Sequence, residues 1–270
     1  MSDRYLHRDG TPFGVKIWEK IDATVTGVAR ARLSARRLLE IEGPYGYALQ
    51  ALFSDSEAVS QAVPGDVRLR VPRAFPVPSL ECPFRLVARD LAAFEETGLP
   101  LDLGAAARAA AACADQEDAL LFYGSEALGL TGLANTKGVQ SVKLASWKTV
   151  GAALDNVLQA VDKLDAAGYH GPYALALPPA LFNPLIRLYP QTGRSELEQL
   201  NQAVSGGVVK AACLDGAGVL VTAVKEIASI AIGRDMETAF VGPAGRDYEF
   251  TIAESLALRL RDPKSVCVLK

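Results

Sequence analysis

The chain has few of the residues that enzymes use to hold metals or to build nucleophilic triads. Its 270 residues include two histidines, His7 in a polar tail and His170 in a glycine-proline turn. Neither place suits a serine or cysteine triad, which would need one of them. The four cysteines stand far apart without a CxxC pair, so we expect free thiols in a reducing cytoplasm and no zinc site: Cys82, Cys113, Cys213 and Cys267. An enzyme is therefore the weaker hypothesis.

Long apolar runs and an excess of one charge are also absent. No run approaches the ~20 apolar residues of a membrane span, and the start Met1–Tyr5 leads into polar sequence unlike a signal peptide. Lysine and arginine number 28 against 31 acidic residues, so the net charge of −3 leaves no basic surplus for nucleic acid. With 50% hydrophobic residues, the chain predicts a folded cytoplasmic protein of one large domain or two lobes.

An alanine-rich stretch, Leu101–Gly124, predicts a buried spine helix. Asp102 can cap its start, alanine is the best helix former, and the closing glycine suits the helix end. One turn carries an acidic group: Asp115, Glu117 and Asp118. No helical Glu-x-x-His follows, as a di-iron site would need. We therefore expect these carboxylates to face water or another subunit.

Two further patterns precede the spine. Thr11 and Pro12 indicate the start of an amphipathic helix, whose apolar residues recur at three- and four-residue spacing. From Tyr47 to about Arg73, a turn at Pro64–Asp66 and a strand-like alternation predict a two-stranded arm. Such a hairpin is only marginally stable alone in water, so we expect another subunit to cover it.

Downstream, strands and helices mix in the manner of an α+β fold. Prolines demote Phe75–Leu86 to an edge strand or an extended segment. The later helices are expected at 147–164, 179–188 and 196–203, and the later strands at 173–177, 208–212, 219–224, 230–232, 248–260 and 266–269. Only Glu254 interrupts the apolar face of the strand at 248–260. We expect it to be paired with an arginine from elsewhere rather than to be catalytic.

Taken together, these elements resemble the encapsulins, also called linocin-type proteins, which are bacterial and archaeal shell subunits with the fold of phage major capsid proteins. The motifs that carry the resemblance occur in order along nearly the whole chain: Trp18–Asp22, Ala35–Arg37, Gly43–Gly46, Gln116–Asp118, Phe122–Gly124, Gly171–Tyr173, Tyr189–Pro190 and the strand around Glu254. The family has no catalytic residues in its shell, which agrees with the separate search for chemistry.

The resemblance implies an α+β fold of the Hong Kong 97 type. It assigns residues 1–46 to a luminal N-terminal helix region, 47–73 to an extended E-loop, 74–132 and 229–270 to a P-domain, and 133–228 to an A-domain. E-loops lie across adjacent subunits, which explains why the predicted arm has nothing in its own subunit to cover it. The implied assembly is a homo-oligomer of about 60 subunits or a larger icosahedral multiple.

The function implied is a self-assembling shell that encloses an enzyme or iron-storage cargo, often a ferritin-like protein or a dye-decolourising peroxidase. The alternative is a phage or prophage capsid protein that packages DNA. A C-terminal peptide of the cargo would dock where the N-terminal helix meets the P-domain, at matching positions: Ile21, Val25, Arg36, Leu38 and Glu40. Some relatives hold a flavin beside a tryptophan early in the P-domain. Residues 84–91 contain none, so we expect no cofactor.

One loop corresponds by order to the loop that rings the fivefold pore in encapsulins: Tyr189, Gln191, Thr192, Gly193 and Arg194. Five copies of its arginine would favour anions through a shared positive field. Pairing across subunits, for example with Glu196, would instead leave a nearly neutral opening. The paired arrangement is the favoured one, because unpaired arginines held close together repel one another.

Overall fold

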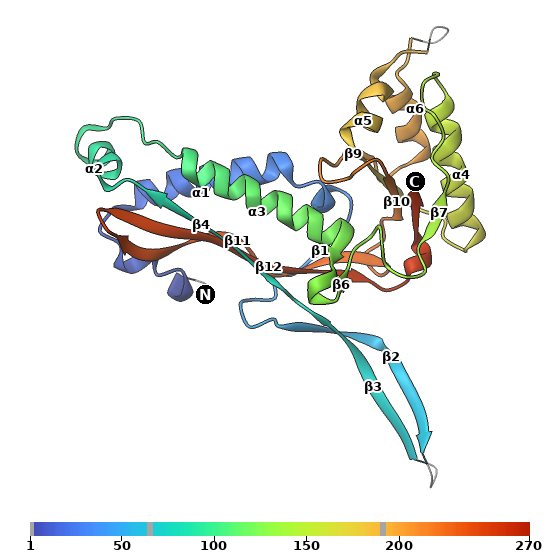
Figure 1. Cartoon of the computed structure of the whole chain (residues 1–270), viewed down its shortest axis with the longest axis horizontal. Coiled ribbons are helices and arrows are strands. Elements are labelled where there is room, and N and C mark those ends of the chain that lie inside the picture. Colours follow the sequence, from blue (N-terminus) through green and yellow to red (C-terminus); the bar gives the residue numbers. More distant parts are fainter. Residues whose placement is uncertain (1–2, 64–66, 190–192) are drawn as a thin grey trace.

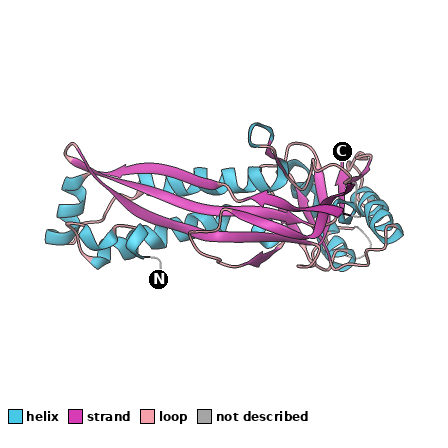
Figure 2. Ribbon diagram, turned by 90° about the horizontal axis from the view of Figure 1, so that it is seen from below, coloured by secondary structure: helices cyan, strands magenta, loops and turns pink. Residues whose placement is uncertain are grey.

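A computed structural model describes residues 3–63, 67–189 and 193–270. Most of its strands belong to a four-stranded sheet of order β1-β11-β12-β4 and a five-stranded sheet of order β7-β13-β10-β8-β9 (Figures 1 and 2). The first sheet contains β1 (Glu40–Glu42), β11 (Ala228–Ala244), β12 (Asp247–Leu260) and β4 (Ser79–Leu86). The second contains β7 (Gln140–Val142), β13 (Val266–Leu269), β10 (Gly218–Thr222), β8 (Tyr173–Leu177) and β9 (Val208–Lys210). The helices are α1 (Val15–Arg32), α2 (Ala88–Thr97), α3 (Gly104–Tyr123), α4 (Ala152–Ala166), α5 (Pro179–Phe182) and α6 (Glu196–Ala203).

The helices α1 and α3 run side by side along one face of the first sheet (Figures 1 and 2). Small alanines of α3, among them Ala106 and Ala110, are fully buried against the apolar stripe of α1 and against Phe250 of β12. Small side chains let the helix approach the sheet closely. The predicted spine helix is thus confirmed, and so is the edge position of β4, which its prolines indicated.

The start of the first helix differs from the prediction. It begins at Val15, with Gly14 rather than Thr11 as the N-cap. The Thr11 hydroxyl instead donates to the Arg8 carbonyl and accepts from the indole nitrogen of Trp18 at 3.3 Å. The threonine therefore closes the preceding turn rather than capping the helix.

The end of the spine helix explains the glycines that follow it. Gly124 has a φ of 69°, and a Cβ there would lie 2.3 Å from the Leu130 carbonyl oxygen of the short β5–β6 ribbon (Gly124–Ser125 and Leu130–Thr131). A Cβ at Gly132 would lie 2.3 Å from the backbone of Phe122. The loop can pack on the helix end only because both positions lack side chains.

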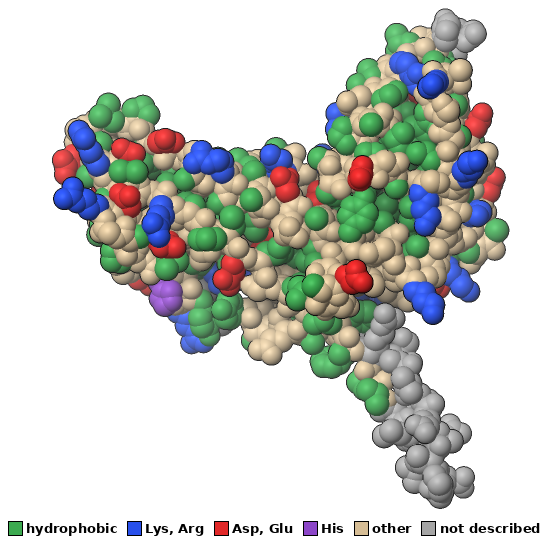
Figure 3. Space-filling view, viewed as in Figure 1, with side chains coloured by type: hydrophobic (Ala, Val, Ile, Leu, Met, Phe, Trp, Pro, Cys, Tyr) green, Lys and Arg blue, Asp and Glu red, His purple; other side chains and the backbone are tan. Residues whose placement is uncertain are grey.

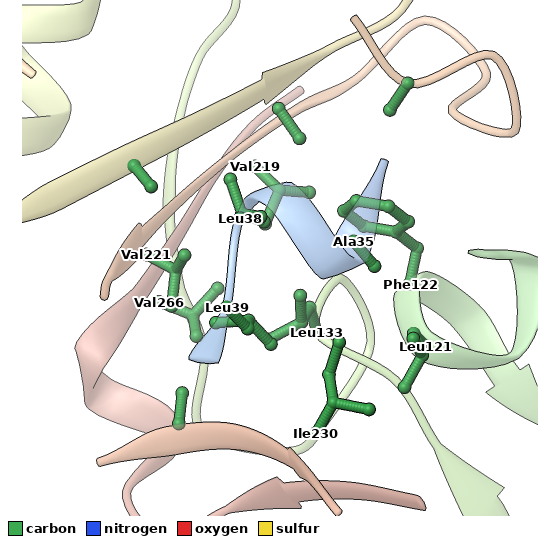
Figure 4. Close-up of a cluster of buried hydrophobic side chains, with 14 of the residues drawn as sticks. Ala35, Leu38, Leu39, Leu121, Phe122, Leu133, Val219, Val221, Ile230 and Val266 are labelled. Carbon is green, nitrogen blue, oxygen red and sulfur yellow. The ribbon is translucent and has the colours of Figure 1, made fainter. Parts of the chain in front are cut away.

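The second sheet contains the last strand of the chain. β13 runs antiparallel to β10 and parallel to β7, so the C-terminus lies in the sheet built mainly from 140–222 (Figure 1). The predicted P-domain range 229–270 thus includes strands of both sheets, β11 and β12 of the first and β13 of the second, and the division into domains stays a prediction. Buried apolar residues at the junction of the two sheets form one cluster, which includes Leu38, Phe122 and Val219 (Figure 4).

Two elements differ in length from their predictions. β11 extends twelve residues beyond the predicted end at Ile232, pairing with β12 through register shifts near Arg234, Glu237 and Gly242. The helix predicted at 179–188 is only the short α5, followed by a 3-10 turn at Asn183–Ile186. The sequence did not predict the longer β11, because polar residues and bulges interrupt the alternation of apolar and polar side chains in that strand.

The predicted arm is a hairpin of β2 (Ala51–Val63) and β3 (Val67–Pro76), and its outer part extends away from the body (Figure 1). The predicted turn at 64–66 lies outside the described residues. At the base, Leu52 packs against Ala231 and Ala257 of the first sheet.

Candidate functional site

The predicted docking residues are divided between the core and the surface. Ile21 and Val25 are 0% and 2% exposed between α1 and the first sheet, and Leu38 is 3% exposed in the junction cluster (Figure 4). Glu40 is exposed at the start of β1. The side chains of Ile21 and Val25 are thus packed mainly within the subunit, although Val25 also lines a hollow, and their part in docking stays a prediction.

Arg36 lies at the centre of an ion cluster that joins four segments. It belongs to the 3-10 turn Ala35–Arg37. Its Nε and Nη2 donate to the Glu117 carboxylate of α3 at 2.7 and 2.8 Å, and Nη2 also donates to Glu254 of β12 at 3.0 Å. Its Nη1 donates to Asp235 of β11 at 2.6 Å. The arginine partner predicted for Glu254 is confirmed, whereas the solvent-facing role predicted for Glu117 is wrong because that side chain is fully buried.

The cluster keeps a proton that an exposed glutamate would lose. Burial and then the charge of Glu117 raise the pKa of Glu254 to about 9, against the opposing effect of Arg36. Cys113 of α3 donates its thiol to Glu254 at 3.3 Å, and burial followed by the Glu254 charge raises the pKa of this thiol. Burial alone would lower the pKa of Arg36, but its bonds to Glu117 and Asp235 raise that pKa above its ordinary value. The guanidinium of Arg36 thus donates hydrogen bonds to two buried carboxyl groups, those of Glu117 and Glu254.

The neighbouring acidic residues of α3 have separate roles. Asp118 is 4% exposed, and its carboxylate accepts bonds from the backbone amides of Ser34 and Ala35 and from the Ser34 hydroxyl. The prediction that it faces water is wrong. Asp115 is exposed and pairs with Arg32 at 3.0 Å. Asp118 therefore fixes the turn that delivers Arg36 to its partners.

Two hollows border α1. One, of about 280 Å³, lies between α1 and β11, where Val25 reaches its floor and Thr26, Met236 and Thr238 line it. Beside it the Arg8 guanidinium donates to Asp22 at 2.7 Å and to the Thr238 carbonyl at 2.8 Å. The other, of about 720 Å³, lies between the end of α1, α3 and the residues after β9.

The predicted pore loop is held at its base by backbone bonds. Gln191 and Thr192 lie outside the described residues. The Tyr189 amide donates to the Arg194 carbonyl at 2.8 Å, and the Gly193 amide donates to the Tyr189 carbonyl at 3.0 Å. Ser195 follows as the N-cap of α6, in a capping box with Glu198. The described residues on the two sides of the loop are therefore joined in a closed turn.

Glu196 anchors this turn to the start of α4. Its side chain is fully buried, and one carboxylate oxygen accepts from the amides of Gly151 and Ala153 at the start of α4. Its other oxygen lies 3.8 Å from the Arg187 guanidinium. The predicted pair between Arg194 and Glu196 of another subunit is wrong, because a neighbour cannot reach this carboxylate. Arg194 borders a hollow with Glu198.

Aromatic and apolar side chains are exposed at the base of the arm and partway along it. Tyr5 stacks on Tyr47 with ring centroids 4.7 Å apart, and the Arg234 guanidinium lies 5.4 Å from the Tyr47 ring centroid. Tyr47 is 63% exposed, Phe53 60% and Val71 50%. Such grouped exposure on a subunit indicates a surface that a partner covers.

Other kinds of site are not found among residues 3–63, 67–189 and 193–270. No group of three histidine, cysteine or acidic side chains is placed there to hold a metal ion, and no helix is long and apolar enough to cross a membrane. On the face in Figure 3, basic and acidic side chains are interspersed rather than sorted into patches of one sign.

Comparisons with known proteins agree with this arrangement. A family model described as "Encapsulating protein for peroxidase" matches residues 2–257. The type 1 encapsulin shell protein EncA of Myxococcus xanthus is 35% identical over 276 residues, which cover 98% of this chain and 96% of that protein. The virus-like particle from Pyrococcus furiosus has a TM-score of 0.76 at 21% identity, covering 94% of this chain and 99% of that chain. The capsid of Myoviridae Phage XM1 has a TM-score of 0.56 at 14% identity, covering 86% and 88%.

The two structural similarities concern the fold, and they confirm the expected phage-capsid architecture of mixed helices and strands. The sequence matches go further, because they cover nearly the whole chain. They favour a structural, non-enzymatic role in a nanocompartment that encloses cargo over DNA packaging. The chain belongs to the family of encapsulin shell proteins.

Proposed function

We propose that many copies of the chain assemble into a closed icosahedral shell in the cytoplasm of a bacterium or archaeon. The shell encloses a cargo protein, which is recruited through the C-terminal segment of that cargo. The observation that carries closure is the arm, since β2 and β3 leave the body and apolar residues are exposed at their base (Figure 1). A second copy can cover both surfaces at once. The likeness in fold to a phage capsid supports icosahedral rather than open assembly.

The cargo proposed is a peroxidase, because the description of the matching family names a peroxidase as the protein that is enclosed. A ferritin-like protein is the alternative. The docking site proposed is the hollow between α1 and β11. Val25, one of the predicted docking residues, lines this hollow together with Met236. A few apolar side chains among polar ones, with the Arg8–Asp22 pair in the lining, suit a short peptide that buries one or two side chains and bonds with the rest.

Filling this hollow should prevent loading. Thr26→Trp places a large ring where the peptide would lie, and we expect at least a tenfold loss of co-purifying cargo from intact shells. Thr24→Trp is the matched control, because residues 24 and 26 flank opposite sides of the buried stripe of α1. Mass spectrometry of purified particles measures the loading. Equal loading of the two variants would move the docking site elsewhere while leaving the shell assignment intact.

The loop from Tyr189 to Arg194 is proposed to surround an opening of the shell. Arg194→Ala should reduce the uptake of a small anion several-fold at low salt, because each copy loses a positive charge beside Glu198. High salt should remove most of the difference by screening. Stopped-flow uptake into loaded shells measures it, with a small cation as the comparison. No change for either ion would remove this loop from any opening.

A further inference from the structure

The Arg36 cluster stands where the spine helix, the first sheet and the connection from α1 to β1 meet. Glu117 and Cys113 reach it from α3, Glu254 from β12, Asp235 from β11, and Arg36 from the 3-10 turn. We propose that the proton on Glu254 is a pH-dependent lock, which fastens α3 to the sheet when present and loosens that attachment when lost. The lock lies within one subunit and does not depend on how cargo docks.

The geometry brings two carboxyl groups to one nitrogen. Arg36 Nη2 donates to Glu117 at 2.8 Å and to Glu254 at 3.0 Å, and both carboxyl side chains are fully excluded from water. A single cation cannot neutralise both when each is ionised. Protonated Glu254 can donate a hydrogen bond, whereas ionised Glu254 repels Glu117 across a medium that screens charge poorly.

The other charged groups around Glu254 offer little compensation. Asp235 is half exposed on β11 and draws on the same guanidinium, which leaves less of its charge for Glu254. Arg234, on the same strand, forms its own pair with Glu237 at 2.6 Å. On β4 the residue paired with Glu254 is the apolar Leu80. The thiol of Cys113 supplies one weak hydrogen bond and no positive charge.

The direction of the effect follows from proton linkage. Glu254 has its pKa raised to about 9 in the folded subunit, whereas the ordinary pKa of an exposed glutamate is 4.5. The closed state therefore holds a proton that the opened state releases at every pH between these values. Its advantage is complete below about pH 4.5, falls as the pH rises, and levels off above about pH 9.

Hydrogen exchange in α3 tests the lock directly. Between pH 6 and pH 9, we expect the protection of α3 amides in the wild-type chain to fall relative to Glu254→Gln by up to about tenfold per pH unit. Comparing the two chains at each pH cancels the intrinsic pH dependence of exchange. Glutamine has the shape of the protonated acid and cannot ionise. Glu249→Gln is the matched control on the same strand, since Glu249 is partly exposed and pairs with Arg85.

A second variant guards against a folding defect at residue 254. Glu117→Gln removes the like charge and leaves Arg36 to Glu254 alone, so the pH-dependent loss of α3 protection should become clearly smaller in this chain, with only the effect of burial remaining. The proposal is overturned if wild type and Glu254→Gln share one pH profile. It is also overturned if Glu117→Gln retains the wild-type slope, or if Glu249→Gln loses it.

Discussion

Replacing Arg36 by methionine is expected to destabilise the subunit by about 3–5 kcal/mol. Methionine keeps an unbranched, flexible side chain, although a shorter one, and leaves Glu117 and Glu254 buried without a cation. The penalty comes mainly from the buried charge of Glu117, which is left uncompensated, rather than from the lost attraction alone. The midpoint of denaturant unfolding, compared at one protein concentration because assembly adds its own stabilisation, measures the effect.

Two controls separate this structural role from the docking role that the sequence suggested for Arg36. Arg37→Met changes the neighbouring exposed arginine, which donates only to the Leu33 carbonyl in the bonds that are described, and should shift stability by less than about 0.5 kcal/mol. Adding Glu117→Gln and Glu254→Gln to Arg36→Met should restore much of the loss, because no buried charge then remains. A stable Arg36→Met shell that merely fails to load cargo would contradict the structural assignment.

Phe250→Ala is expected to cost about 3–5 kcal/mol. The ring is fully buried in β12, stacked on Phe84 at 5.2 Å between centroids, with Trp18 and Phe240 each at 5.6 Å. Removing it opens a cavity where α1 meets the first sheet and also breaks these aromatic contacts, which adds to the area term. The same denaturant measurement applies.

Val241→Ala is the comparison for that change. Val241 follows Phe240 on β11 and is 60% exposed. Its truncation should therefore change the free energy of unfolding by less than about 0.5 kcal/mol. If Phe250→Ala and Val241→Ala were equally mild, the core between α1 and the first sheet would not be the source of subunit stability.

Local signals predicted several elements closely. The helix expected at 196–203 is α6 with those bounds, and the apolar run Tyr173–Leu177 is a strand buried along its whole length. Glycine and aspartate marked the limits of the spine within a few residues. These features depend on neighbours in sequence, which is why the sequence alone was informative.

The site was harder to predict because its members come from distant segments. Nothing in the sequence shows that Arg36 crosses to Glu117, 81 residues later, or that Asp118 holds the turn at Ser34. The burial of two predicted docking residues has a related reason. The periodicity that brought Ile21 and Val25 to notice is that of a buried helix face, and packing against Phe250 and α3 uses that face within the subunit.

The central claim is that many copies of this chain build a closed shell. Electron microscopy of the purified protein, with light scattering on the same sample at native salt and micromolar concentration, tests it most directly. We expect uniform icosahedral particles, with the β2–β3 arm of one subunit lying across its neighbour in the reconstruction. A monodisperse monomer or dimer under these conditions would contradict the account.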